Sequence, residues 1–292
     1  MARKSDWIIG GSLVAGFFIM IAVIGLVFLV SLIRSDNEFA YRSDQRIGVV
    51  EVNGIITDSG NVVDRVIQYR EDDSVKAIVL RINSPGGVVA PTQEIYAELR
   101  KTRDGGKTII ATMGSVAASG GYYIACAADS ILANPGTLTG SIGVIFEVPN
   151  AEGLFDKIGI DWQVIKSGDH KDIGSPARQL TREERGFMQA VVDDTYNQFV
   201  DVVTGNRPLA RDEVLEISDG QVFTGNQAIS LGLVDRLGTF QDAIDLAGGL
   251  AGITGKPDLL KPKKKTIFDL MVENMESVFQ GQTSVLLEYR LR

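Results

Sequence analysis

Residues 77–87 read AIVLRINSPGG, an apolar run that stops at a proline and two glycines. A run without alternation of polar and apolar positions is typical of a parallel strand that is buried on both faces. Proline and glycine end such a strand, and we expect a helix over residues 91–103. The run therefore predicts a strand–turn–helix unit of an α/β domain.

The same alternation extends along the chain in both directions. Strands are expected at residues 47–52, 108–113, 130–133, 142–148 and 162–166, and helices at residues 62–70, after the turn at 114–121, and over 181–203. The last helix opens with Thr181-Arg182-Glu183-Glu184, the pattern of a capping box. Alternating strands and helices with apolar strands predict an α/β domain with largely parallel pairing.

An uncharged segment precedes this domain. Residues 7–33 carry no charge, and about 20 apolar residues suffice to cross a bilayer. Arg3 and Lys4 come before the segment, which predicts a cytoplasmic N-terminus. A cleaved signal peptide is the alternative, but its apolar core would be only about 7–15 residues long. We therefore divide the chain into a cytoplasmic stub and transmembrane anchor (1–34), a linker (35–45), a main domain (46–260) and a C-terminal tail (261–292).

Composition excludes several kinds of function. The net charge of −8 argues against nucleic acid as a partner. The single cysteine, Cys126, cannot form an internal disulfide, and its apolar neighbours predict a buried, inert thiol. The single histidine, His170, excludes a zinc site built on several histidines, and a Ser-His-Asp triad would have to use it. We expect no metal or cofactor.

Four turns carry the candidate functional residues, at positions 84–87, 117–121, 139–143 and 167–176. Each one taken singly reads as an ordinary turn or, for Ser119, as a helix N-cap. In open α/β sheets, however, sites are built at strand ends. Ser119 has small neighbours that would let a peptide backbone approach it. The amides of Gly86 and Gly87 could hold a developing oxyanion.

A nucleophilic serine needs a base. Because His170 is the sole histidine, a lysine is the remaining candidate, provided that burial keeps its amine uncharged.

Four motifs carry a resemblance to a known family: SPGG (84–87), ASGGYY (118–123), TGSIG (139–143) and KDIGSP (171–176). From about residue 47 to 253, the sequence resembles the signal peptide peptidase A family in its short, single-copy bacterial form. The resemblance implies the spiral of ββα units shared with Clp proteases and crotonases. It also implies that residues 46–260 are a Ser–Lys protease domain.

The family's functional residues fall on defined positions of this chain. The resemblance implies Ser119 as nucleophile, Lys171 as general base and Ser141 as the hydroxyl that hydrogen-bonds the lysine. It implies that the oxyanion amides are those of Gly86 or Gly87 and of Gly120. Family members form ring- or dome-shaped homo-oligomers, and in short forms the serine and lysine of one site come from neighbouring subunits. His170 is the alternative base.

The resemblance further implies hydrophobic peptide substrates, such as cleaved signal peptides. The expected location is the bacterial inner membrane, with the catalytic domain outside the cytoplasm. The alternatives are a site-specific protease for a membrane protein, as in the stomatin-associated type, a coenzyme A enzyme of the crotonase fold, and a non-catalytic membrane scaffold. We also hypothesise that residues 284–292 occupy a substrate groove, although a packing or disordered end is the simpler interpretation.

Overall fold

The computed structural model describes Met20, Gly25, residues 45–261 and residues 287–290. The chain divides into two units, Met1–Ser43 and Asp44–Arg292. The anchor expected at residues 7–33 lies outside the described residues, apart from Met20 and Gly25. Among the residues that are described, no helix has both the length and the apolar character needed to span a bilayer.

A central sheet carries the second unit, and the described residues contribute eight strands to it. Its order is β10-β1-β2-β4-β5-β9, while β6 pairs with both β4 and β8. All of these pairs are parallel except β6 with β8, so the prediction of largely parallel pairing is confirmed. The strand bounds are β1 (Arg46–Asn53), β2 (Val75–Ser84), β4 (Thr108–Ala118), β5 (Ser130–Ala133), β6 (Leu138–Gly140), β8 (Val222–Thr224), β9 (Arg236–Leu237) and β10 (Asp258–Leu260).

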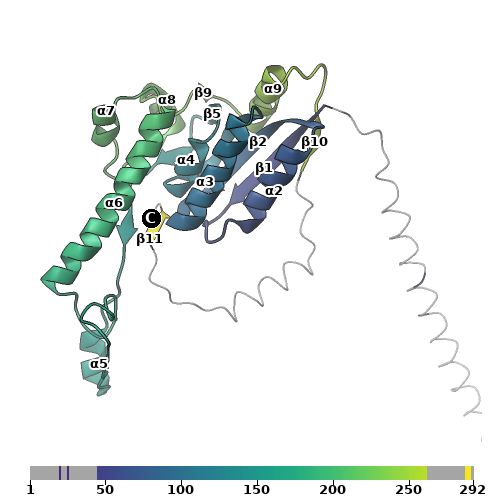
Figure 1. Ribbon diagram of the computed structural model, residues 1–292. Helices are drawn as coiled ribbons and strands as arrows, with labels where there is room; N and C mark the ends of the chain where they lie inside the picture. Colours follow the sequence, from purple (N-terminus) through teal and green to yellow (C-terminus); the bar gives the residue numbers. More distant parts are fainter. Residues whose placement is uncertain (1–19, 21–24, 26–44, 262–286, 291–292) are drawn as a thin grey trace, which may run out of the picture. The chain divides into compact units, whose positions relative to one another are not determined.

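Helices cover both faces of this sheet, and Figure 1 shows α2 and α3 over β1 and β2 on one of them. Ile78, Leu80 and Ile82 of β2 pack into the core beneath α2 (Gly60–Glu71), α3 (Val89–Asp104) and α4 (Gly120–Ala125). Ala77 and Val79 face the other way, into a second core under α9 (Phe240–Leu250). Burial on both faces explains why the run at 77–82 does not alternate. Each large side chain buried there contributes about 1.5–3 kcal/mol.

Helix α6 (Arg182–Asn206) begins where the capping box predicted. The Thr181 hydroxyl accepts a hydrogen bond from the Glu184 amide at 3.1 Å, and the Glu184 carboxylate accepts one from the Thr181 amide at 2.9 Å. Two short helices follow, α7 (Arg211–Glu216) and α8 (Gly225–Ser230).

The segment that precedes α6 leaves the body of the domain. Helix α5 (Glu152–Ile158) lies apart from the sheet, beyond the N-terminal end of α6 (Figure 1). Residues 159–171 are all exposed. We call residues 147–180 the arm. Several of its apolar side chains are exposed, among them Leu154, Ile158, Trp162 and Ile165.

Three sequence-based expectations were wrong in detail. β4 continues through Ala118, where a turn had been expected from residue 114, because Ala117 and Ala118 pair with β6. The strand expected at 142–148 is reduced to β7 (Ile145–Phe146), while β6 lies earlier in the chain, within the expected turn at 139–143 and just before it. Residues 162–166 form no strand, because the arm lies away from the sheet, where no neighbouring strand is available to pair with it.

Candidate active site

Ser119 lies at the junction of β4 and α4. Its backbone has φ 51° and ψ −117°, a conformation that residues other than glycine rarely adopt. Its side chain is 1% exposed, and no group in the described part of the chain hydrogen-bonds its Oγ. It occupies the N-cap position of α4 without capping the helix. A buried hydroxyl without a partner costs about 1–3 kcal/mol, and such a cost usually has a functional reason.

Ser141 lies beside Ser119 because β4 and β6 run in parallel. Ala118 pairs with Gly140, and the Ser119 amide donates to the Gly140 carbonyl at 2.8 Å. Ser141 follows directly, is 7% exposed and also has positive φ, at 50°. Two serines that are 22 positions apart in the sequence thus end adjacent strands, both in a strained conformation.

Glycines allow the backbone to pass closely behind these serines. Gly86 has φ 104°, which favours glycine. A Cβ on Gly87 would overlap the carbonyl oxygen of Ile56. A Cβ on Gly121 would lie 2.9 Å from the carbonyl oxygen of Ser84. Gly87 and Gly121 are therefore required by close backbone contacts, and Gly86 is favoured by its backbone angle.

The three candidate oxyanion donors differ in what their amides face. The Gly86 amide donates to the Ser84 hydroxyl at 3.1 Å. On β3 (Gly86–Val88), the Gly86 carbonyl and the Val88 amide are bonded to Ile56, so the intervening Gly87 faces the opposite edge. Gly120 begins α4, so its amide has no partner within the helix. Gly87 and Gly120 are therefore better candidates than Gly86.

These amides lie beside a position in the second sheet that holds one strand, between β3 and β7. We call this position the slot. β11 (Leu287–Arg290), labelled in Figure 1, lies between β3 and β7 and pairs with both in antiparallel orientation. Tyr289 pairs with Gly87, and Arg290 pairs with Gly86. The hypothesis placed residues 284–292 in a groove. Residues 287–290 lie between β3 and β7, and two of them pair with Gly86 and Gly87, whereas residues 284–286 and 291–292 lie outside the described part.

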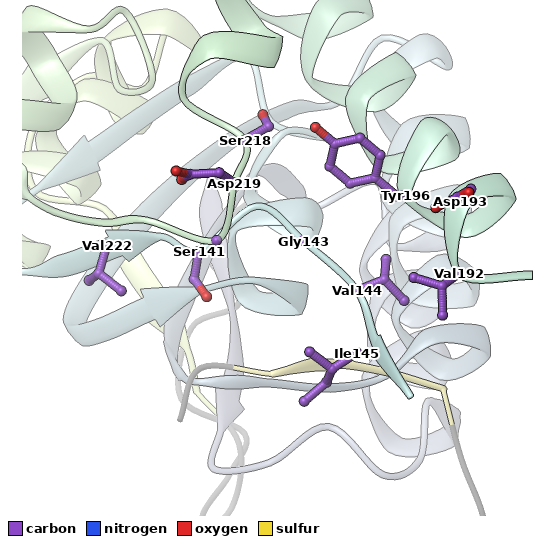
Figure 2. A pocket seen from close by; sticks show the side chains of 11 residues that line it. Ser141, Gly143, Val144, Ile145, Val192, Asp193, Tyr196, Ser218, Asp219 and Val222 are labelled. Carbon is purple, nitrogen blue, oxygen red and sulfur yellow. The ribbon is translucent and has the colours of Figure 1, made fainter. Parts of the chain in front are cut away.

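A cavity of about 460 Å³ adjoins the slot, and Ser141 and Ile145 both line it (Figure 2). Its other walls include apolar side chains, the phenol of Tyr196 and the carboxylate of Asp219. Burial raises the pKa of Tyr196. The Ser218 hydroxyl, also in this wall, is buried, and the structure gives it no partner among the residues described. The cavity is large enough for one amino-acid side chain.

Lys171 does not join these residues. Its side chain is exposed on the arm, and its amide donates to the Gly168 carbonyl at 3.1 Å. Because Ser119 Oγ has no partner in the described chain, the two groups are not hydrogen-bonded within one protomer. His170, the alternative base, also belongs to the arm, where its ring packs on Phe187 at 4.7 Å between centroids. The structure thus brings together Ser119, Ser141 and the glycines, and leaves the basic groups outside.

An ion cluster next to Lys171 was not anticipated from the sequence. Arg178 donates to the carboxylates of Asp172 and Glu184, and Lys166 donates to Asp172 at 2.8 Å. These hydrogen bonds, from Arg178 first, hold the pKa of the Asp172 carboxyl well below its usual range. Hydrogen bonds from Arg178 and from the Thr181 amide lower the pKa of Glu184 to about 2. The capping box pointed to Glu184, but no sequence pattern linked it to Asp172 or Arg178.

Cys126 is 1% exposed, so the prediction that it is buried is confirmed. Burial raises the pKa of its thiol to about 12, which suppresses the reactive thiolate. No group of three or more residues that could hold a metal ion occurs among residues 45–261.

Two family models match the chain. The model described as Peptidase family S49 matches residues 101–254, which include Ser119, Ser141 and Lys171. The model described as Clp protease matches residues 45–137, which include the Gly86-Gly87 turn. The α/β fold with its mixed sheet agrees with a fold of the Clp protease type.

Three similar proteins are named as proteases or peptidases. A putative protease of Synechocystis is 45% identical over 74% of this chain and 78% of its own length. The putative signal peptide peptidase SppA of Enterococcus faecium is 38% identical over 70% of this chain and 63% of its own. Protease 4 of Salmonella typhi is 36% identical over 78% of this chain and 38% of its own. The chain therefore spans less than two thirds of the length of the last two proteins.

Proposed function

Since the chain belongs to peptidase family S49 and is a serine peptidase, we propose that it is a membrane-anchored Ser–Lys endopeptidase that degrades hydrophobic peptides, such as cleaved signal peptides. We also propose that residues 46–260 form the spiral of ββα units and that residues 7–33 form the anchor in the bacterial inner membrane. The catalytic domain would then lie outside the cytoplasm.

The observation that carries the proposal is the buried, unpartnered hydroxyl of Ser119 at a strained strand-to-helix turn. In the proposed reaction, an uncharged Lys171 amine takes the proton of Ser119, and Oγ attacks the peptide carbonyl carbon. Amides of Gly87 and Gly120 hold the oxyanion, and the Ser141 hydroxyl holds the amine in place. The protonated lysine gives its proton to the leaving amine, and water then hydrolyses the acyl-enzyme.

Lys171 would be supplied by a neighbouring protomer. Two observations support this: the Lys171 side chain is exposed, and apolar side chains of the arm, such as Trp162 and Ile165, are exposed with it. Packing the arm against a second copy would bury these side chains and exclude water from the lysine. Burial is what favours an uncharged amine. The homo-oligomer, a ring or dome, is therefore part of the proposed mechanism.

The substrate proposal rests on the slot between β3 and β7. Both strands pair with one extended segment, which is how a sheet edge binds a peptide without reading its sequence. The adjoining cavity, with Ile145 in its wall, would receive an apolar side chain. A membrane anchor would keep the enzyme where hydrophobic peptides remain after cleavage.

Complementation tests both the dyad and its sharing between protomers. We expect Ser119→Ala and Lys171→Ala homo-oligomers each to lose detectable hydrolysis of a synthetic signal peptide. Co-expressing the two variants should restore part of the activity, because mixed neighbours contain an intact Ser119–Lys171 pair. Mixing Ser119→Ala with wild-type protein at matched ratios controls for dilution. Full activity of Lys171→Ala would refute the proposed base, and no restoration in proven mixed oligomers would refute sharing.

Site-specific cleavage of one membrane protein, as in the stomatin-associated type, is the alternative, because the same dyad would serve it. Comparing signal peptides of unrelated sequence separates the two: similar rates support general degradation, and cleavage of a single sequence supports the alternative. A coenzyme A enzyme of the crotonase fold would not react with a fluorophosphonate, whereas Ser119 should. A non-catalytic scaffold predicts that Ser119→Ala changes nothing.

A further inference from the structure

The Arg178 side chain forms hydrogen bonds with two carboxylates, one from a residue before it in the sequence and one from a residue after it. Its Nε and Nη2 donate to the two oxygens of Asp172 at 3.0 and 2.7 Å. Its Nη1 and Nη2 donate to the two oxygens of Glu184 at 2.8 and 2.6 Å. The carboxylates are largely withdrawn from water, with 11% of the Asp172 side chain and 5% of the Glu184 side chain exposed. Two-pronged contacts of this kind fix orientation as well as distance.

These contacts connect Lys171 to the body of the domain. Asp172 is the next residue to Lys171, and Glu184 belongs to the capping box at the start of α6. Farther along α6, Phe199 and Val203 are buried in the main core. The other hydrogen bonds within residues 166–175 are local to the turn, such as that from the Lys171 amide to the Gly168 carbonyl. The Asp172–Arg178–Glu184 chain is thus a hydrogen-bonded link through which α6 can hold Lys171, beside the ring contact of His170 with Phe187.

The cluster also sets the charge beside Lys171. Lys166 donates to Asp172 Oδ1 at 2.8 Å and to the Asp169 carbonyl at 2.7 Å. Arg178 and Lys166 therefore balance the charges of Asp172 and Glu184. The remaining titratable groups of this loop are Asp169 and His170, and the ring of His170 packs on Phe187 of α6. A carboxylate left without these partners would favour a charged amine next to it.

We propose that Arg178 is a positioning residue for the general base. It holds the turn that carries Lys171 at a fixed place relative to α6. It also pairs with the Asp172 carboxylate, so that this negative charge does not stabilise the protonated amine of Lys171. The proposal rests on the function proposed for Lys171. Misplacing a reacting group by about 1 Å can cost on the order of 100-fold in rate, so the effect of losing Arg178 should be large.

Three variants test it in the full-length oligomer. Arg178→Gln should lower kcat for a signal peptide by roughly 10- to 100-fold with little change in KM, and should move the acidic limb of the kcat/KM profile to higher pH. Arg178→Lys keeps the charge but not the two-pronged geometry. We therefore expect kcat to fall while the acidic limb of the kcat/KM profile stays at its wild-type pH. Asp172→Asn removes the carboxylate, so kcat should fall without an upward movement of the limb.

Arg211→Gln is the matched control. Arg211 also pairs with a carboxylate of α6, that of Asp201, but both side chains are well exposed and are separate from the arm. It should retain wild-type kcat and pH dependence. Circular dichroism and the oligomer mass are measured for every variant. If Arg178→Gln fails to fold, Asp172→Asn replaces it, because its side chain keeps the same shape.

The outcomes separate this inference from the proposed function. Wild-type kcat and an unmoved acidic limb in folded Arg178→Gln and Asp172→Asn oligomers would overturn the positioning role. An active Lys171→Ala enzyme would instead overturn the general base itself. An inactive Lys171→Ala enzyme together with the shifted profile of Arg178→Gln would support both.

Discussion

Single residues carry the strain in this site. Ser119 and Ser141 both have positive φ, although neither is a glycine. Each of these conformations costs of the order of 1–3 kcal/mol and persists only because the surrounding sheet holds it. The hydrogen bonds from the Ser119 amide to Gly140 and from the Ser141 amide to Gln221 supply that restraint. The strain keeps the Ser119 hydroxyl out of the capping role that serine usually takes at a helix start.

Gly87→Ala is expected to abolish activity and to destabilise the fold. The added Cβ would overlap the Ile56 carbonyl, a backbone group that no rotamer change can move. We expect kcat/KM to fall at least about 100-fold, as for loss of one oxyanion donor, together with a lower Tm. Gly136→Ala is the control, because a Cβ there meets nothing within 4 Å. Near wild-type kinetics of Gly87→Ala would contradict the close approach of β3 to Ile56.

At the scale of elements, two short strands form the slot proposed to bind peptides, and the start of α6 holds the Arg178 ion cluster. β3 is only three residues long and β7 only two, yet between them they define the slot that β11 fills. Helix α6, of 25 residues, joins the core to the base of the arm. Its N-terminal capping box and the Arg178 cluster meet at Glu184.

Removing β11 tests whether the tail competes with substrate. A chain ending before residue 284 should show a higher kcat/KM for short peptides, because the edges of β3 and β7 become free for pairing. A synthetic peptide of sequence SVLLEYRLR (284–292) should then inhibit the truncated enzyme competitively, and a scrambled peptide should not. Unchanged hydrolysis after truncation would dismiss the competition.

The stability contributed by Glu184 should depend on pH. Its folded pKa of about 2 is below the unfolded value of about 4.3. A lowered carboxyl pKa stabilises the fold fully above the unfolded pKa, and this contribution disappears as the pH falls toward the folded pKa. Urea unfolding of wild type and Glu184→Gln should therefore differ at pH 6 and converge near pH 2. A difference that is constant over this range would show that the carboxylate charge is not involved.

At the scale of the whole molecule, the described part of one protomer keeps the two members of the proposed catalytic pair, Ser119 and Lys171, apart. The proposed nucleophile and oxyanion amides lie at the sheet, while Lys171 is on an arm with several exposed apolar side chains. A monomer with this surface would be prone to association. This arrangement supports the proposal that activity, and not only stability, requires an oligomer.

Ile165→Asp tests this requirement. The Ile165 side chain is fully exposed on the arm, so the change should leave the folded protomer intact but prevent burial of the arm. We expect a smaller oligomer by mass photometry and a large loss of peptide hydrolysis. Leu250→Asp, at an exposed position on α9, is the control and should retain both. A fully active Ile165→Asp oligomer would exclude this part of the arm from the interface.

Local patterns were sufficient for much of the fold. The apolar run at 77–82 identified β2, and Thr181 with Glu184 located the start of α6, because both depend on residues that are close in the sequence. The four turns were likewise visible as Gly, Pro and Ser clusters. The resemblance then assigned roles to Ser119, Ser141 and Lys171 that no single turn could establish.

Long-range contacts determined the rest. The extension of β4 to Ala118 depends on β6. The pairing of β11 joins it to β3, about 200 residues away, and to β7, about 140 residues away. The absence of a strand at 162–166 depends on where the arm leaves the sheet. None of these contacts leaves a local signature, because strand pairing joins partners that are distant in the sequence. The separation of Lys171 from Ser119 is of the same kind, since it is set by the path of the arm through space.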